Sequence, residues 1–194
     1  ATIIRAYDEP TALLLLNSAQ FAAVLILTSL HTQTYPALTK ALVSYATEKG
    51  GTVIAGFMFP SFMNMTQFKQ FFKQFGKNWT GGSYERRDFI RNDEDKSKQG
   101  QSSPTAIQEL GRRTVDPLPK TYSMKALHAN GVTREEAIYL NERFRKPTKN
   151  EGELEAPIAF ASVGKGWLGY LGDVNIEGPT QLVAKAMLGL HGNN

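Results

Sequence analysis

The sequence contains no cysteine. Disulfide bonds, thiolate metal sites and cysteine nucleophiles are therefore excluded for this chain. Histidine is also scarce, because the 194 residues include three histidines, and no two of them have the spacing of a metal-binding motif. We therefore expect no metal site. The absence of cysteine and of an opening signal sequence favours a reducing, cytoplasmic compartment.

Long apolar runs are lacking as well. The longest candidate, from Leu13 to Leu30, is interrupted by Asn17, Ser18 and Gln20, so no run approaches the roughly 18 residues that cross a bilayer. We therefore expect no membrane partner. The formal charge of +4 is only mildly basic, which would assist contact with an anionic ligand but does not indicate nucleic-acid binding.

The phosphate-binding sequences of common nucleotide sites are also missing. No Gly-x-Gly-x-x-Gly follows the first apolar strand, and there is no Walker sequence. Neither a dinucleotide nor ATP is indicated, and we expect no cofactor.

The first sixty residues alternate between strand and helix patterns. A β-type run covers 2–7, and Asp8-Glu9-Pro10 opens a helix that runs to about residue 17. The nearly continuous apolar run 21–30 predicts a strand buried on both faces. A second helix runs over 36–49 and ends at Gly50-Gly51, before another buried strand over 52–59. Helices that link buried strands predict a parallel sheet.

Further along, an amphipathic helix is predicted over residues 66–77, with phenylalanines at i, i+3, i+4 and i+7. Its basic face is read as solvated surface, and the alternative is a helix that binds a membrane surface or a partner. Residues 92–105 carry no large apolar side chain, so we expect an exposed loop, inserted into a single domain that spans 1–194. A similar polar stretch covers 146–155.

The end of the chain predicts a β-hairpin and a helix. Residues 156–163 form a strand, Gly164-Lys165-Gly166 a tight turn, and 167–171 the returning strand. Residues 172–175 leave this strand as a loop, and Pro179 opens a terminal helix that runs to Leu190.

This closing segment, from Val163 to Asp173, resembles the closing hairpin of class I glutamine-amidotransferase-like domains, most closely the trehalose-utilisation (ThuA-like) domains. The stretch Lys49-Gly50-Gly51-Thr52-Val53-Ile54 also resembles the family's approach to its functional elbow. The resemblance implies a three-layer Rossmann-like (flavodoxin-like) α/β fold with a mostly parallel sheet. The strand and helix that usually open this fold are not apparent before Ala1.

The sequence departs from the family at the positions that carry its chemistry. Catalytic members place a cysteine on a strained turn after the Gly-Gly strand, whereas this chain reads Gly56-Phe57-Met58-Phe59-Pro60-Ser61. Asp173 stands where the family's closing strand ends in Leu-Gly-His. Since no nucleophile is available for a thioester, we expect no glutaminase or amidotransferase activity.

Six residues are candidates for a ligand site. Asp173 and Asn175 follow a strand end, where α/β sheets bind ligands, although both residue types also stabilise turns. Ser61 is the hydroxyl nearest the expected elbow. Tyr84 and Arg86 combine an aromatic ring with a cation that grips anions, unless neighbouring carboxylates pair with the arginine. The sixth candidate is His128.

Two functions therefore compete. The first is a non-catalytic amidotransferase-like module that binds a small molecule or a partner protein. The second is a hydrolase or lyase that acts on a sugar-like or nucleoside-like substrate, with Asp173 and either His128 or Glu85 as acid and base. A nucleic-acid binder ranks last, because it rests only on modest positive charge and on the segment from Trp79 to Arg91.

Overall fold

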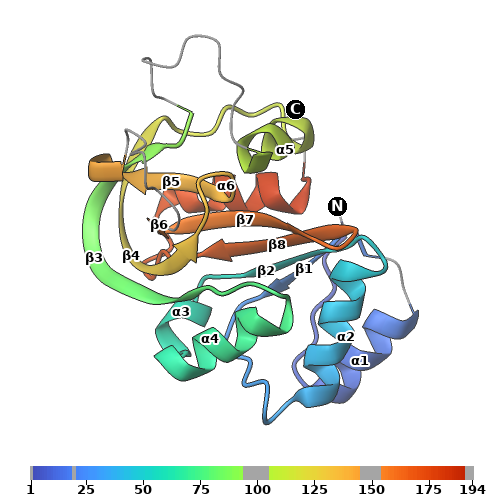
Figure 1. Cartoon of the computed structure of the whole chain (residues 1–194). Helices are drawn as coiled ribbons and strands as arrows, with labels where there is room; N and C mark the ends of the chain where they lie inside the picture. The colour runs from blue at the N-terminus through green and yellow to red at the C-terminus, as the bar shows by residue number, and fades with distance from the viewer. Residues whose placement is uncertain (1, 19–20, 94–104, 145–153, 191–194) are drawn as a thin grey trace.

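The computed structural model describes residues 2–18, 21–93, 105–144 and 154–190. These residues form an eight-stranded sheet with helices on both sides (Figure 1). The elements in chain order are α1 (Glu9–Ser18), β1 (Ala23–Ile26), α2 (Pro36–Thr47), β2 (Thr52–Ala55), α3 (Phe59–Phe62), α4 (Met65–Gln74), β3 (Thr80–Arg91), α5 (Thr105–Arg113), β4 (Thr121–Val132), β5 (Ala137–Asn141), the 3-10 helix η1 (Glu142–Phe144), β6 (Leu154–Ala156), β7 (Ile158–Val163), β8 (Gly166–Leu171) and α6 (Gly178–Leu188).

The sheet is mixed, and its order is β1-β2-β8-β7-β5-β3-β4-β6. The pairs β1–β2 and β2–β8 are parallel, and every other pair of neighbours is antiparallel. The α/β class and the parallel pairing of the first two strands are therefore confirmed. The expectation of a mostly parallel sheet is wrong, because the strand-helix alternation of the first sixty residues does not continue into the middle of the chain.

The two faces of the sheet have separate apolar cores. One core joins α1, α2, α3 and α4 to the sheet and includes Val53 and Tyr170. The other joins α5 and α6 to the opposite face and includes Ile54 and Phe160. Val53 and Ile54 are neighbours in β2 and point to opposite faces, so this strand is buried on both sides, as its continuous apolar sequence predicted.

An aromatic cluster dominates the first core. The predicted amphipathic helix is confirmed as α4, which begins with a capping box formed by Asn64 and Gln67. Its buried phenylalanines meet rings from α3, β8 and the start of β3, with centroids between 4.7 and 6.4 Å apart. The cluster comprises Phe59, Phe68, Phe71, Phe72, Phe75, Trp79 and Tyr170.

The antiparallel part of the sheet curls strongly. β3 and β4 are each 12 residues long, and both curve along the left of Figure 1. The residues that leave β8 run back along β4, where Ala126 and Asp173 form a bridge. The Leu127 amide donates to Gly172 at 3.0 Å and the Val174 amide to Lys125 at 2.9 Å. The loop after β8 is therefore fixed to β4 by backbone hydrogen bonds.

Several predicted boundaries need correction. Residues 2–7 form no strand, because β-type residues form a strand only against a neighbouring strand. The side chains of Ile3, Ile4 and Tyr7 are exposed. β1 covers only 23–26 of the predicted 21–30, and β2 ends at Ala55 rather than residue 59. Pro157 separates β6 from β7, where one strand over 156–163 was expected.

The two polar stretches lie mainly outside the described residues, which omit 94–104 and 145–153. At their described ends the expectation of an exposed loop is wrong. Asn92 is buried, and its side-chain amide donates to the carbonyls of Arg134 and Ala137. Thr105 is the first residue of α5, and Leu154 and Glu155 belong to β6.

Candidate functional site

The carboxyl ends of β1, β2 and β8 lie side by side, because these strands are parallel neighbours. Loops at such strand ends are where open α/β sheets usually bind ligands. Within the described ranges, the non-glycine residues with positive φ are Phe57, at 61°, and Ile176, at 57°. Phe57 follows β2 and Ile176 lies in the loop after β8, so both strained residues belong to this edge. Backbone strain of this kind is often stored at functional sites.

Phe57 occupies the turn between β2 and α3. The Gly56 amide donates to Ile26 and the Met58 amide to Leu27, so the turn is held against the end of β1. The Phe57 ring is partly buried and packs against the core that includes Ile54. This turn therefore has the shape of an elbow, but its side chain is a hydrocarbon that supplies neither a nucleophile nor a base.

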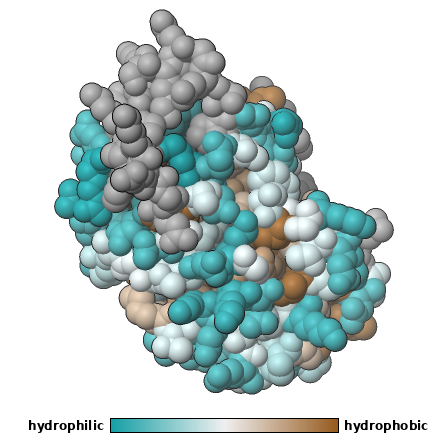
Figure 2. Space-filling model, viewed as in Figure 1, coloured by the Kyte–Doolittle hydropathy of each residue, from teal (hydrophilic) through white to brown (hydrophobic). Residues whose placement is uncertain are grey.

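Four exposed apolar residues lie in the segments that follow β1 and β2, and we call them the strand-end surface: Leu27, Met58, Phe62 and Met65. Their exposed fractions are 51%, 41%, 57% and 52%. Met58 is bonded to Leu27 through its backbone, and one turn of α3 separates it from Phe62. On the face shown in Figure 2 hydrophilic residues predominate, and a pale brown area lies where Figure 1 places α3 and α4. Clustered apolar exposure of this kind is typical of interaction sites.

The sequence segment that carries Met58, Phe62 and Met65 lacks negative charge. No aspartate or glutamate occurs between Glu48 and Glu85 in the sequence. Lys69 and Lys73 are exposed on α4, while Lys77 donates to Glu136 at 2.8 Å. The strand-end surface is therefore apolar with a basic margin.

Asp173 is fully buried and has a structural role. Its Oδ1 accepts from the Asn175 amide at 2.9 Å, and its Oδ2 accepts from the Glu177 amide at 2.7 Å and the Thr180 hydroxyl at 2.6 Å. These bonds hold the loop that leads into α6 and place a carboxylate near the first turn of the helix, where negative charge is favourable. Asn175 itself is exposed. Of the two expected roles for Asp173, the geometry favours the bracing of a turn.

Arg86 and Tyr84 project from β3 beside this loop. The Arg86 guanidinium donates to the Glu177 carboxylate at 2.8 Å, and this bond holds the pKa of Glu177 below its usual value. The Lys125 ammonium lies 4.9 Å from the centroid of the Tyr84 ring, which is exposed. The cation that was expected to grip a ligand is thus paired internally, but with the distant Glu177 rather than with its sequence neighbours Glu85 or Asp88.

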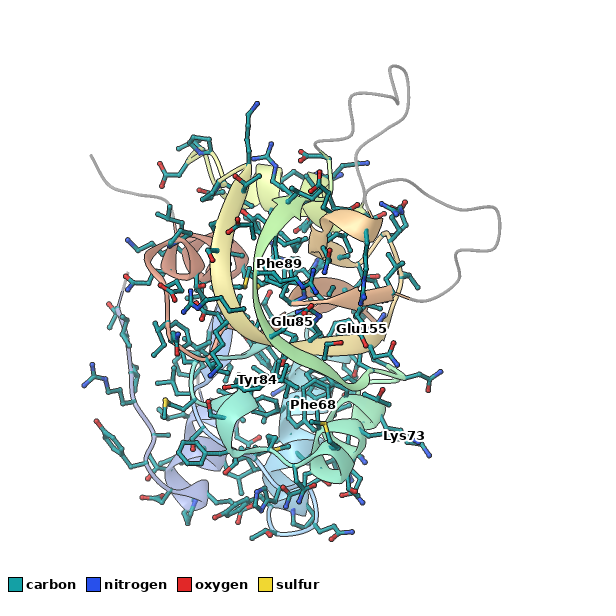
Figure 3. All side chains as sticks on the ribbon, turned by 90° about the vertical axis from the view of Figure 1, so that its left-hand side faces the viewer. Phe68, Lys73, Tyr84, Glu85, Phe89 and Glu155 are labelled. Atoms are coloured by element: carbon teal, nitrogen blue, oxygen red, sulfur yellow. The ribbon has the colours of Figure 1, made fainter. Side chains whose placement is uncertain are left out.

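His128 is separated from these residues. On β3 and β4, Tyr84 and Arg86 pair with Leu127 and Lys125, whereas His128 has the opposite parity on its strand and points to the other face. Its side chain is 1% exposed and packs edge-on against Phe89. Figure 3 shows Glu85, Phe89 and Glu155 grouped along the curved strands, away from Lys73.

The six candidate residues therefore do not form one site. Asp173, Asn175 and Arg86 come together through the loop 173–177, and Tyr84 lies beside them on β3. Ser61 is exposed in α3, near the elbow but without a basic partner among the described contacts. His128 lies on the opposite face of β3 and β4. No cluster of three metal-ligating side chains occurs in the described ranges.

The sequence did not reveal the two strained residues. Phenylalanine and isoleucine rarely adopt positive φ, so no residue-type signal marks Phe57 or Ile176. The apolar strand-end residues were also missed, because Met58 and Phe62 look like core residues in a sequence. Their exposure depends on α3 being a single turn, with Met58 and Phe62 on its solvent side.

Comparison with known proteins adds no relative, since no family model, curated protein or solved structure matches the chain. None of the helices in the described ranges is both long and apolar enough to cross a bilayer.

Proposed function

We propose that this chain is a non-catalytic, amidotransferase-like module that binds a partner protein or a small molecule at the carboxyl ends of β1, β2 and β8. The observation that carries the proposal is Phe57, whose φ of 61° places a strained turn directly after β2. Catalytic members of the superfamily that the sequence resembles carry their cysteine on such a turn. In this chain a strained turn follows β2, and the Phe57 side chain supplies no nucleophile.

Three other features support this kinship. Gly50-Gly51 precedes β2, with Gly50 in the left-handed conformation. Gly164 and Lys165 join β7 to β8, and a side chain at Gly164 would collide with the backbone of Thr47. Helices cover both faces of the sheet. A three-layer Rossmann-like ancestry, closest to the ThuA-like domains, and a cytoplasmic location belong to the same proposal.

The strand-end surface supports binding rather than catalysis. It combines four exposed apolar side chains with a basic margin, and two of the four are methionines, whose flexible side chains adapt to different partners. The alternative, a hydrolase or lyase, draws no support from the geometry. Asp173 is buried with both oxygens occupied, Glu85 pairs with Arg87, and the carboxylate nearest to His128 belongs to Glu155.

The first test concerns catalysis. Purified protein incubated with glutamine should release ammonia at the background rate, and Ser61→Ala should leave any other measured function unchanged. Glutamine hydrolysis above background that disappears in Ser61→Ala would contradict the proposal.

The second test locates binding. The five methionines can be labelled with carbon-13 at their methyl groups, and their NMR signals followed during titration with pools of amino acids, sugars and nucleosides, or with a purified partner. A true ligand should shift the signals of Met58 and Met65. The buried Met124 and Met187 serve as internal controls on the opposite face. A ligand that shifts only these two would place binding elsewhere.

A partner protein can be tested in the same framework. A photo-crosslinking amino acid placed at Phe62 should capture a partner that the same group at Lys165, in the turn between β7 and β8, does not. The captured protein is then purified and its affinity measured directly. Phe62→Ser should weaken that affinity at least tenfold, since a central apolar contact is worth about 1–2 kcal/mol or more.

A further inference from the structure

His128 is a buried histidine whose ring nitrogens have no hydrogen-bond partner among the described residues. Its Nδ1 lies 3.5 Å from Oε2 of Glu155, which is too long for an effective hydrogen bond. Buried polar atoms are nearly always paired, so an unpaired imidazole in β4 is an exception that calls for a physical reason.

The charged groups around His128 come from three elements. Glu155 lies on β6, Glu85 on β3, and Arg143 on η1. The nearest carboxylate oxygen, Oε2 of Glu155, already accepts from the Ser83 hydroxyl at 2.6 Å and lies 3.7 Å from the Arg143 guanidinium. A proton on His128 would therefore compete with two existing partners for one oxygen. Burial lowers the pKa of His128 from its usual value, against the opposing effects of Glu155 and Glu85.

β6 is the element most easily displaced when His128 gains a proton. It is three residues long, lies at the edge of the sheet and pairs only with β4 in the sheet order. Its register with β4 is irregular between Asn130 and Val132, where Gly131 has a φ of 88°. β6 therefore has few backbone bonds to lose, and its release would expose the strand segment next to His128 to water.

From this arrangement we propose that His128 is a proton-operated latch. The neutral imidazole allows β6 to dock on β4, and a proton on the imidazole favours the opening of this edge of the sheet in mildly acidic solution. The site is separate from the strand-end surface. A result that contradicts the latch would therefore leave the proposed function untouched, and the reverse also holds.

The physical reason is the cost of a buried charge. An imidazolium in this position can be stabilised either by water or by Glu155. Water becomes available when the short edge strand detaches, whereas Glu155 is already engaged by Ser83. Once β6 is released, His128 regains an ordinary pKa of about 6.5, so each pH unit below that value should favour the open form by up to about tenfold.

Native-state hydrogen exchange of the full chain tests the latch. The amides of 129–132 and 154–156 are followed between pH 7.5 and 5.5, with the rates corrected for intrinsic exchange. Their opening constant should rise about tenfold over this range and should exceed that of the β2 amides. Opening in step with β2 at every pH would show that the region unfolds only globally and would overturn the proposal.

Two matched variants sharpen the result. His128→Gln removes the titratable group and should make the opening constant independent of pH. His31→Gln removes a histidine in the loop between β1 and α2 and should leave the pH dependence unchanged.

If His128→Gln does not fold, the pKa of His128 can be measured in the wild-type protein by NMR titration of its imidazole, and this value tests the latch. A His128 pKa below 6.5, lowered further in Glu155→Gln, supports the latch. A pKa above 6.5, together with slower exchange in acid, would show that Glu155 clamps the protonated form and would overturn it.

Discussion

The helical layer of α3 and α4 and the curled strands β3 to β6 are stabilised in different ways. The helical layer packs aromatic rings against the sheet, and its core side chains carry almost no polar atoms. The curled strands bury His128 and Asn141, and Asp173 lies where the loop after β8 meets them. The first region depends on apolar area, which tolerates changes in pH, and the second depends on individual hydrogen bonds between distant residues.

The largest expected effect tests the apolar half of this comparison. Phe72 is fully buried and its ring contacts those of Phe59, Phe68, Phe71, Trp79 and Tyr170. Phe72→Ala should lower the free energy of unfolding by about 3–5 kcal/mol, because it removes a large side chain from a site that cannot collapse fully. Urea denaturation provides the measurement. Phe62→Ala, on the exposed end of α3, is the control and should change stability by less than about 0.5 kcal/mol.

The middle effect tests the hydrogen-bonded half. Asp173→Ala leaves the amides of Asn175 and Glu177 and the hydroxyl of Thr180 without their acceptor. We expect a loss of about 2–3 kcal/mol in the free energy of unfolding. Asn175→Ala, in the same loop but exposed, should be nearly neutral. Equal effects of the two substitutions would mean that the loop contributes little to the curled strands.

The smallest effect concerns a residue outside both regions, on the face of the sheet that α5 and α6 cover. Arg113 on α5 donates to the Thr52 hydroxyl of β2 and the Met187 carbonyl of α6, each at 2.9 Å, and lies over the rings of Phe160 and Trp167. Arg113→Met keeps the aliphatic stem and should destabilise the fold by about 1–2 kcal/mol, with a change in Trp167 fluorescence.

Its neighbour provides a matched control. Arg112 pairs with the same Glu109 but its side chain is 70% exposed. Arg112→Met should therefore alter stability by less than about 0.5 kcal/mol. A larger loss in Arg112→Met than in Arg113→Met would show that the pairing with Glu109, rather than the contacts to β2 and α6, stabilises α5.

The sequence predicted the elements that have a local apolar pattern, and it did not predict the curled strands. The helices α1, α2, α4 and α6 and the strands β1, β2, β7 and β8 all overlap predicted segments, because their apolar residues follow a local period. β3 reads Thr-Gly-Gly-Ser-Tyr-Glu-Arg-Arg-Asp-Phe-Ile-Arg and carries exposed charges on both faces. A strand of this composition is defined by its partners, which lie more than thirty residues away in β4 and β5, and no local pattern reports them.

The candidate site, too, could be predicted only where the signal is local in the sequence. The sequence correctly pointed to the loop after β8 and to the turn after β2 as strand-end positions. It could not distinguish a ligand-binding Asp173 from a buried brace, because that difference depends on Thr180 and on the bridge to Ala126. Glu155, the carboxylate nearest to His128, was assigned to a polar stretch, since its strand partner Asn130 is distant in the sequence.

The pairing of β2 with β8 constrains how the chain is made. Thr52 pairs with Trp167, so β2 has only β1 beside it until the ribosome has added most of the described chain. During this interval Val53 and Ile54, which are completely buried in the finished fold, lie on an unpaired strand edge. Synthesis at about 5–20 residues per second leaves that edge open for several seconds. We therefore expect the nascent chain to bind chaperones during that time, and a product released by a ribosome that stalls before Trp167 to be prone to aggregation.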